Sequence, residues 1–105
     1  MSGFRTRQDE AGALALEGEI TVFHAHAVKD AVLAHVALDE CPVFDLSAVS
    51  DIDSSGVQLL LLARREAACA DKRLRWQAHS HAVLRALETL NLGHVLDAPA
   101  TLLNA

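Results

Sequence analysis

The residue types best suited to chemistry gather in one short stretch of acidic and hydroxyl side chains, Asp51-Ile52-Asp53-Ser54-Ser55-Gly56. The apolar run Val43-Phe44-Asp45-Leu46 and a polar turn over 47–51 precede it, and a mostly apolar run over 57–62 follows it. This order predicts a strand, a loop and a helix. The stretch is therefore expected at a helix start, where free backbone N–H groups and the helix dipole favour an anion such as a phosphate.

The two serines of this stretch have a structural as well as a chemical interpretation. Ser54 or Ser55 is the expected N-cap of the helix, because a hydroxyl accepts a hydrogen bond from the free N–H groups of the first turn. Gly56 lets the backbone stay closely packed and open to an approaching partner. A cap is worth about 1 kcal/mol and does not require two hydroxyls and a glycine after an aspartate. The stretch is therefore a candidate modification site.

The elements that must position this stretch follow from hydrophobic periodicity along the chain. A first strand held by Phe4 is expected to turn near 9–12 into a half-buried second strand, and strands and helices alternate thereafter. The expected elements are a strand over 14–22, helix 24–38, strand 41–46, helix 55–70, strand 72–78 and a helix that Ser80 caps. Such alternation predicts an α/β domain. With 105 residues, we expect one domain over 1–105 with its core at about 13–97.

Three segments resemble the STAS domain of the anti-sigma-factor antagonist family. Asp53-Ser54-Ser55-Gly56, after the segment 44–49, is similar to the central motif of that family. Leu16-Glu17-Gly18-Glu19-Ile20 resembles its early strand end, and the segment 80–92 resembles its last helix. The resemblance spans roughly 14–96, and it implies a small mixed β-sheet of about four or five strands with helices packed against it.

The resemblance also implies a function and a set of site residues. The first serine of the family motif is the phosphoacceptor of a serine kinase, which assigns Ser54 as phosphoacceptor. Its loop would comprise Asp51, Asp53, Ser55 and Gly56. A stand-alone, cytoplasmic bacterial protein of this kind would bind an anti-sigma factor or a serine kinase when unmodified, and release it when phosphorylated.

The helix after the motif carries more apolar residues than a single core stripe needs. Val57 lies on the expected core stripe, whereas Leu59 and Leu62 fall on other sides of the same helix. Neighbouring helices could cover these two leucines, or they could form a docking patch beside the serines. With Thr21, these three residues are the predicted partner-binding positions.

Thr21 marks a departure from the family pattern. It stands where many antagonists carry an aspartate next to the phosphoacceptor loop, and Gly18-Glu19-Ile20-Thr21 resembles a STAS subgroup associated with chemotaxis-type signalling. The alternative function is accordingly a binding module without phosphorylation. Such a module could be a cytoplasmic subunit of a transporter ATPase complex or a component of chemotaxis-type signalling.

Composition argues against several other classes of function. A formal net charge of -5 and a pI of about 5.6 disfavour binding to nucleic acid or to an anionic membrane surface. The apolar run over 59–63 is too short to cross a bilayer. Met1–Glu10 does not resemble a signal peptide, so Cys41 and Cys69 are expected to be reduced cytosolic thiols.

Catalytic and metal-binding motifs are also missing from the sequence. The serine motif is not G-x-S-x-G, and no Walker-type or dinucleotide-binding glycine pattern occurs. The chain has six histidines, at positions 24, 26, 35, 79, 81 and 94, but none has a carboxylate or cysteine at a recognisable ligand spacing. We therefore expect a protein that is not an enzyme and that needs no metal or cofactor.

Overall fold

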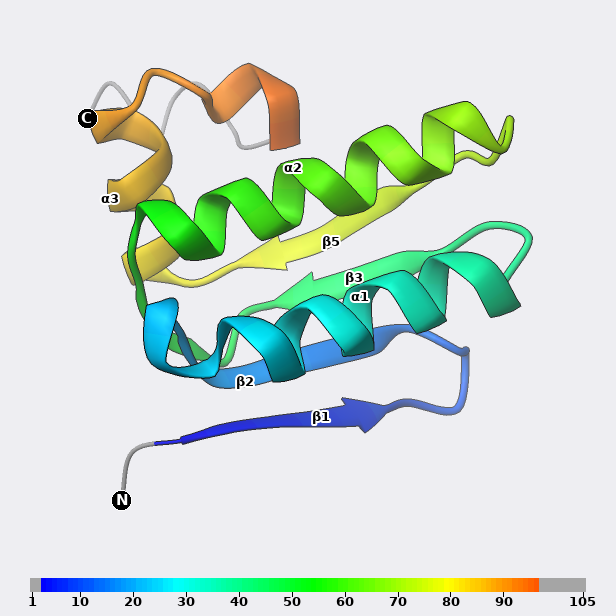
Figure 1. Ribbon diagram of the computed structural model, residues 1–105, viewed down its shortest axis with the longest axis horizontal. Helices are drawn as coiled ribbons and strands as arrows, with labels where there is room; N and C mark the ends of the chain where they lie inside the picture. Colours follow the sequence, from blue (N-terminus) through cyan, green and yellow to red (C-terminus); the bar gives the residue numbers. More distant parts are fainter. Residues whose placement is uncertain (1–2, 97–105) are drawn as a thin grey trace.

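The computed structural model describes residues 3–96 of the chain (Figure 1). The elements, in chain order, are β1 (Phe4–Gln8), β2 (Leu14–Ile20), η1 (Val22–His24), α1 (Ala25–Leu38), β3 (Val43–Leu46), β4 (Val49–Ile52), α2 (Ser54–Cys69), β5 (Arg75–His79), α3 (His81–Thr89) and η2 (Gly93–Leu96). The sequence also suggests a short tail in which Leu102 and Leu103 could dock, and both residues lie outside the described part.

The five strands form one mixed sheet. β1 runs antiparallel to β2, with Phe4 opposite Gly18 and Gln8 opposite Leu14. β3 and then β4 pair in parallel with β2, and β5 pairs in parallel with β3. The prediction of a small mixed sheet of four or five strands is confirmed. Because β2, β4 and β5 are parallel, their carboxyl ends meet at the same end of the sheet.

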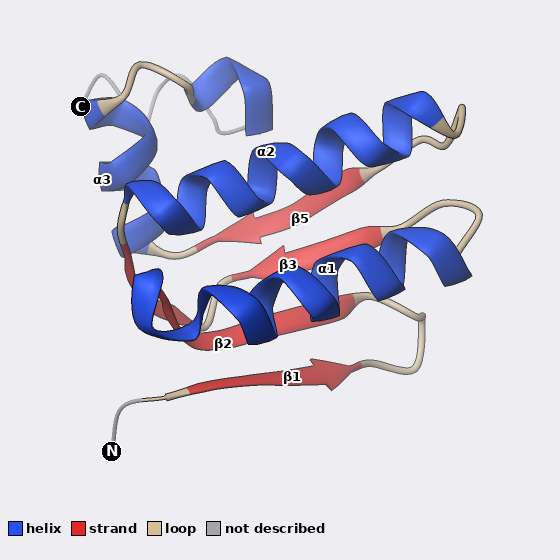
Figure 2. Ribbon diagram, in the orientation of Figure 1, coloured by secondary structure: helices blue, strands red, loops and turns tan. Residues whose placement is uncertain are grey.

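The hydrophobic core lies between the sheet and two helices. α1 and α2 cover one face of the sheet, and α3 packs at one end, near β4 (Figures 1 and 2). Alternate strand residues and residues from both helices point into this layer. Its fully buried side chains, all 0% exposed, include Leu16, Ile20, Phe44, Leu46, Val28, Val32, Leu60 and Ala63. Phe44 stacks on Trp76 at a centroid distance of 5.3 Å, and the His35 ring packs edge-on against Phe44 at 5.0 Å.

One glycine in β2 is required by close backbone contact. Gly18 has φ of 91°, and a Cβ built on it would lie 2.1 Å from the carbonyl oxygen of Gly3. A side chain here would push the first strand off the sheet. The Gly18 position of the family-like segment is thus explained by the pairing of β1 with β2.

The segment after β3 differs from the sequence prediction. The polar turn expected over 47–51 is limited to Ser47 and Ala48, and Val49–Ile52 forms the additional strand β4. Val49 is only 2% exposed and lies opposite Gly18, whereas Ser50 and Asp51 face solvent. Pairing with the long strand β2 thus overrides the turn preference of the polar residues.

A lysine joins the carboxyl ends of the two long helices. Lys72 follows the end of α2, and its Nζ donates hydrogen bonds to the carbonyl oxygens of Val36 at 2.6 Å and Ala37 at 3.1 Å. Both carbonyls belong to the last turn of α1, where a cation is favoured by the helix dipole. The lysine therefore stabilises the packing of α1 on α2.

Replacing this lysine tests that contribution. Lys72→Met keeps the alkyl stem and removes both hydrogen bonds, so the free energy of unfolding should fall by about 1 kcal/mol. Urea unfolding followed by circular dichroism measures the change. Arg73→Met is the matched control, because Arg73 is exposed and should give almost no loss. Equal stability of the two variants would contradict this role.

Candidate functional site

The acidic and hydroxyl-rich stretch lies where the carboxyl ends of the parallel strands meet. β4 ends at Ile52, Asp53 forms the connection, and α2 begins at Ser54. The connection between β2 and α1 and the start of α3 lie at the same end of the molecule (Figure 2). Ligand and partner sites of α/β sheets commonly form at the carboxyl ends of strands.

Asp53 is the N-cap of α2, and it also holds the neighbouring loop. Its Oδ1 accepts a hydrogen bond from the Gly56 backbone N–H at 3.0 Å, and its Oδ2 accepts one from the Val22 N–H at 3.0 Å. The prediction that Ser54 or Ser55 caps the helix is therefore wrong. The carboxylate uses a separate oxygen for each of these N–H groups, so it bonds two segments of the chain at once.

The same hydrogen bonds set the ionisation of this carboxyl group. Partial burial acts to raise the pKa of Asp53, but the donated N–H groups of Val22, Gly56 and Ser55 more than offset it, so the pKa lies below 3.8. Asp53 is thus a carboxylate at neutral pH, and its charge sits at the positive end of the helix dipole.

The two serines of the motif have no role in capping. Ser54 is exposed and Ser55 is half-buried. Within residues 3–96, neither hydroxyl takes part in a hydrogen bond, since Asp53 alone provides the cap. Ser54 is the first residue of the helix, so its hydroxyl lies on the surface at the start of α2.

Gly56 is required by contact with the chain itself. It is buried, and a Cβ built on it would lie 2.0 Å from the Ile20 carbonyl oxygen and 2.8 Å from Cγ1 of Ile52. The expected close packing at Gly56 is confirmed, but the expectation that its backbone is also open to a partner is wrong, because the residue is buried. The glycine instead lets the first turn of α2 press against the end of β2, which fixes the position of the serines.

Two of the four predicted partner-binding residues lie in the interior. Val57 is 0% exposed and Thr21 is 6% exposed, so neither side chain is presented to a partner. Leu59 is partly buried against the core, and Leu62 is partly buried in a surface hollow that also involves Leu92. Neighbouring elements thus cover much of both leucines, which was one of the two alternatives for them.

Thr21 has no hydrogen bond for its hydroxyl. Its Oγ1 is buried without a partner, and its side chain does not cap the helical turn that follows. The Asp53 carboxylate already accepts from Val22, the first N–H group of that turn. Thr21 therefore contributes packing at this end of the sheet rather than a contact surface.

An exposed apolar pair beside the motif was missed at the level of sequence. Val22 is 59% exposed and Phe23 is 87% exposed, directly after the buried end of β2. The Asp53 hydrogen bond fixes the backbone of this pair next to the start of α2. In the sequence, the signal for this exposed pair is two apolar residues just past a strand end. A longer strand with alternating apolar residues explains the same two residues equally well.

An open cavity of about 700 Å³ lies on the other side of the motif. Residues 49–54 form one wall, and the start of α3 with Arg85 and Leu90 forms the other. Ser54 and His81 both border this space. The sequence does not predict this cavity, because it depends on where α3 packs relative to β4 and the start of α2.

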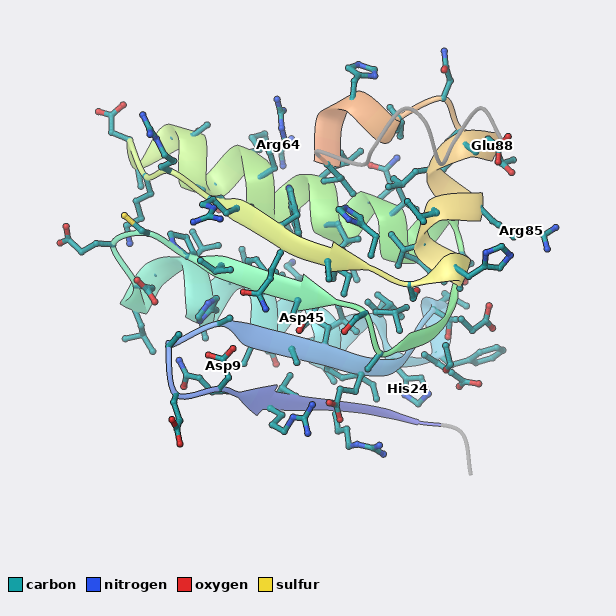
Figure 3. The ribbon with its side chains drawn as sticks, turned by 180° about the vertical axis from the view of Figure 1, so that it is seen from behind. Asp9, His24, Asp45, Arg64, Arg85 and Glu88 are labelled. Atoms are coloured by element: carbon teal, nitrogen blue, oxygen red, sulfur yellow. The ribbon has the colours of Figure 1, made fainter. Side chains whose placement is uncertain are left out.

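The remaining histidines and cysteines are placed elsewhere. His35 Nε2 donates to the Val43 carbonyl at 3.0 Å, and His79 Nε2 donates to the Leu96 carbonyl at 2.8 Å. His24 Nε2 lies 3.3 Å from Glu19 Oε1, at the edge of the site (Figure 3). Cys41 and Cys69 are exposed free thiols.

Across residues 3–96, no three histidine, cysteine or acidic side chains are grouped so that they could hold a metal ion. None of the helices in that part combines the length and the apolar character that a membrane crossing needs.

The pKa of Asp53 predicts how stability depends on pH. A carboxyl group with a lowered folded-state pKa stabilises the fold above its unfolded pKa, about 3.9, and loses this contribution as pH falls through the folded value. Asp53→Asn should lose about 1 kcal/mol at pH 7, because the amide has a single acceptor oxygen and one of the two hydrogen bonds is lost, and the loss should be smaller at pH 3. Urea unfolding at several pH values measures the difference.

The other low-pKa carboxyl group provides the control for that prediction. Burial acts to raise the pKa of Asp45, while hydrogen bonds from Ser47 and the charge of Arg7 lower it overall. The contribution of the Asp45 carboxylate to the free energy of unfolding is therefore lost in the same acid range. This contribution is still present in Asp53→Asn. A variant whose deficit relative to the parent is the same at pH 7 and pH 3 would contradict the role of the Asp53 charge.

Comparison with known proteins identifies the family. The family model described as "Mlab, STAS domain" matches residues 4–102. No match is found among curated proteins. An anti-sigma factor antagonist from Mycobacterium paratuberculosis has a similar structure, with a TM-score of 0.75, 22% identity, and coverage of 93% of this chain and 89% of that one.

Two structures of SpoIIAA are also similar. The unphosphorylated anti-sigma factor antagonist SpoIIAA has a TM-score of 0.65 at 19% identity, covering 88% of this chain and 84% of that one. The phosphorylated form of the Bacillus cell fate determinant SpoIIAA has a TM-score of 0.62 at 18% identity, covering 88% and 86%. These likenesses show a shared fold, and the match of the family model over nearly the whole chain shows that this protein belongs to the STAS domain family.

Proposed function

We propose that this protein is a regulatory antagonist of the anti-sigma-factor type, which binds a protein partner and releases it when Ser54 is phosphorylated. The observation that carries the proposal is the exposed Ser54 hydroxyl, which has no hydrogen bond within residues 3–96 because Asp53 caps the helix. A serine without a structural role at this position is available to a kinase. The similar folds of antagonists solved in phosphorylated and unphosphorylated forms support the same interpretation.

The chemistry of the modification belongs to the kinase. The Ser54 oxygen would form a bond to the terminal phosphorus of a nucleoside triphosphate, the nucleoside diphosphate would leave, and the hydroxyl proton would pass to a base of the kinase. The product carries about -1.5 to -2 charges on Ser54. The chain itself supplies only the acceptor hydroxyl and a rigid, accessible position for it.

The fold should tolerate this charge while the surface changes. The phosphate would sit on the first turn of α2, where the helix dipole favours an anion. Asp51 and Asp53 already make this surface acidic, so a partner that packs there would meet a much stronger negative field. Stability and binding thus respond in opposite ways to the same group, as a switch requires.

The partner surface that the geometry favours includes the exposed pair Val22 and Phe23. An aromatic side chain that is 87% exposed is a suitable anchor for an apolar pocket of a partner. A partner that packs around this anchor through apolar or acidic groups would be repelled by the charge added at Ser54. This pair takes the contact role that the sequence assigned to Val57 and Thr21.

A charge at the phosphoacceptor position tests the switch. Ser54→Asp should weaken binding to an anti-sigma factor or kinase recovered from the native cells by about tenfold or more, with unchanged folding. Isothermal titration and circular dichroism measure both. Ser47→Asp, which adds the same charge to the exposed turn after β3, is the matched control and should bind normally.

Two other outcomes of these binding measurements would contradict the switch. Equal affinity of the parent and Ser54→Asp would exclude the switch. If Ser54→Ala and Ser54→Asp both bind normally while Leu62→Asp does not, the protein is instead a constitutive binding module that uses α2. Mass analysis of Ser54 in protein from its native cells gives an independent check.

The anchor role of Phe23 has its own test. Phe23→Ser should weaken partner binding by about tenfold or more, because a central aromatic anchor contributes 2 kcal/mol or more to an interface. Leu38→Ser is the matched control, since Leu38 is also 87% exposed but lies at the far end of α1. Similar affinities of the two variants would rule out the Phe23 contact without affecting the role of Ser54.

A further inference from the structure

The cavity beside Ser54 has the features of a phosphate-binding site. Its walls include the starts of both α2 and α3, and the free N–H groups at helix starts favour anions. Arg85 and His81 from α3 border the same space as Ser54. They lie four residues apart on one face of that helix. Two helix starts and an arginine thus surround one opening of about 700 Å³.

Arg85 has no ion-pair partner among the described residues. It is exposed, and no carboxylate within residues 3–96 lies within ion-pair distance of it. Its side chain extends from α3 toward solvent, and Glu88, one turn further on, does not pair with it (Figure 3). A guanidinium group can bind two oxygens of a phosphate at once, so it is the side chain best suited to hold one.

The carboxylates of the site leave this arginine available. Both oxygens of Asp53 already accept backbone hydrogen bonds, from Gly56 and Val22, and Asp53 forms no ion pair with Arg85. Asp51 is exposed and borders the cavity, and it is the one remaining acidic group in the cavity wall. A phosphate, with about two charges and three oxygens, would compete strongly against this single carboxylate.

We propose that Arg85 binds the phosphoryl group of phosphorylated Ser54 across this cavity. The inference rests on the proposed function for the presence of the phosphate, and it adds where that phosphate goes. The ion pair would join the second turn of α3 to the first turn of α2 and fill the opening between them. Phosphorylation would then reshape the partner surface as well as add charge to it.

The test installs the phosphate without any kinase or partner. Phosphoserine is incorporated at position 54 of the full chain during translation, and its phosphorus NMR signal is followed against pH. The second pKa of free phosphoserine is about 6, and a nearby guanidinium lowers it. Arg85→Gln should raise the titration midpoint by about 0.5 pH unit or more, and Arg85→Lys should raise it less.

The matched control removes the same charge from another helix position. Arg64 is exposed on α2, ten residues beyond Ser54 and thus about 15 Å along the helix (Figure 3). Arg64→Gln should leave the midpoint unchanged. Equal midpoints in the parent and in Arg85→Gln would overturn the proposal.

A second measurement does not depend on a variant. In the parent chain, the Nε–H signal of Arg85 should move and narrow when Ser54 carries the phosphate, because a bidentate pair fixes the guanidinium. An unchanged signal would also overturn the proposal. Neither readout involves partner binding, so failure here is distinct from failure of the switch itself, which the Ser54→Asp titration decides.

Discussion

The carboxylate of Asp53 is the interaction on which the site depends. Its two oxygens accept hydrogen bonds from the first turn of α2 and from the connection between β2 and α1. In the second of these bonds, Val22 lies 31 residues before Asp53 in the sequence. Gly56 makes this possible, because only a residue without a side chain lets the helix start lie against the Ile20 carbonyl. One charged group therefore sets the relative position of the sheet end, the helix start and the adjacent loop.

This arrangement separates the structural from the chemical residues of the motif. A serine used as the N-cap would have its oxygen engaged by the helix, and its modification would remove a cap worth about 1 kcal/mol. With the cap on Asp53, a change at Ser54 leaves the helix start intact. The same bridge presents Val22 and Phe23 to solvent beside the serine, so one interaction positions both the modifiable group and the apolar contact.

The sequence predicted what local patterns determine and failed where distant segments compete. The α/β class and the Ser80 cap followed from local residue preferences, and the structure confirms them. The choice of Asp53 over Ser54 as N-cap depends on Val22, which local pattern does not place nearby. The extra strand β4 likewise depends on pairing with β2, and the cavity with Arg85 depends on the position of α3.

The electrostatics of this end of the molecule explain why a single phosphate could act without unfolding the chain. Three helices begin near the carboxyl ends of the parallel strands, so their dipoles and free N–H groups create a region that accommodates negative charge. Asp53 already uses part of this field, as its lowered pKa indicates. An incoming partner has no such compensation, because it must desolvate its own groups against the same charge. In the proposed switch, a phosphate on Ser54 would therefore be tolerated within the domain and opposed across the interface, without any large conformational change.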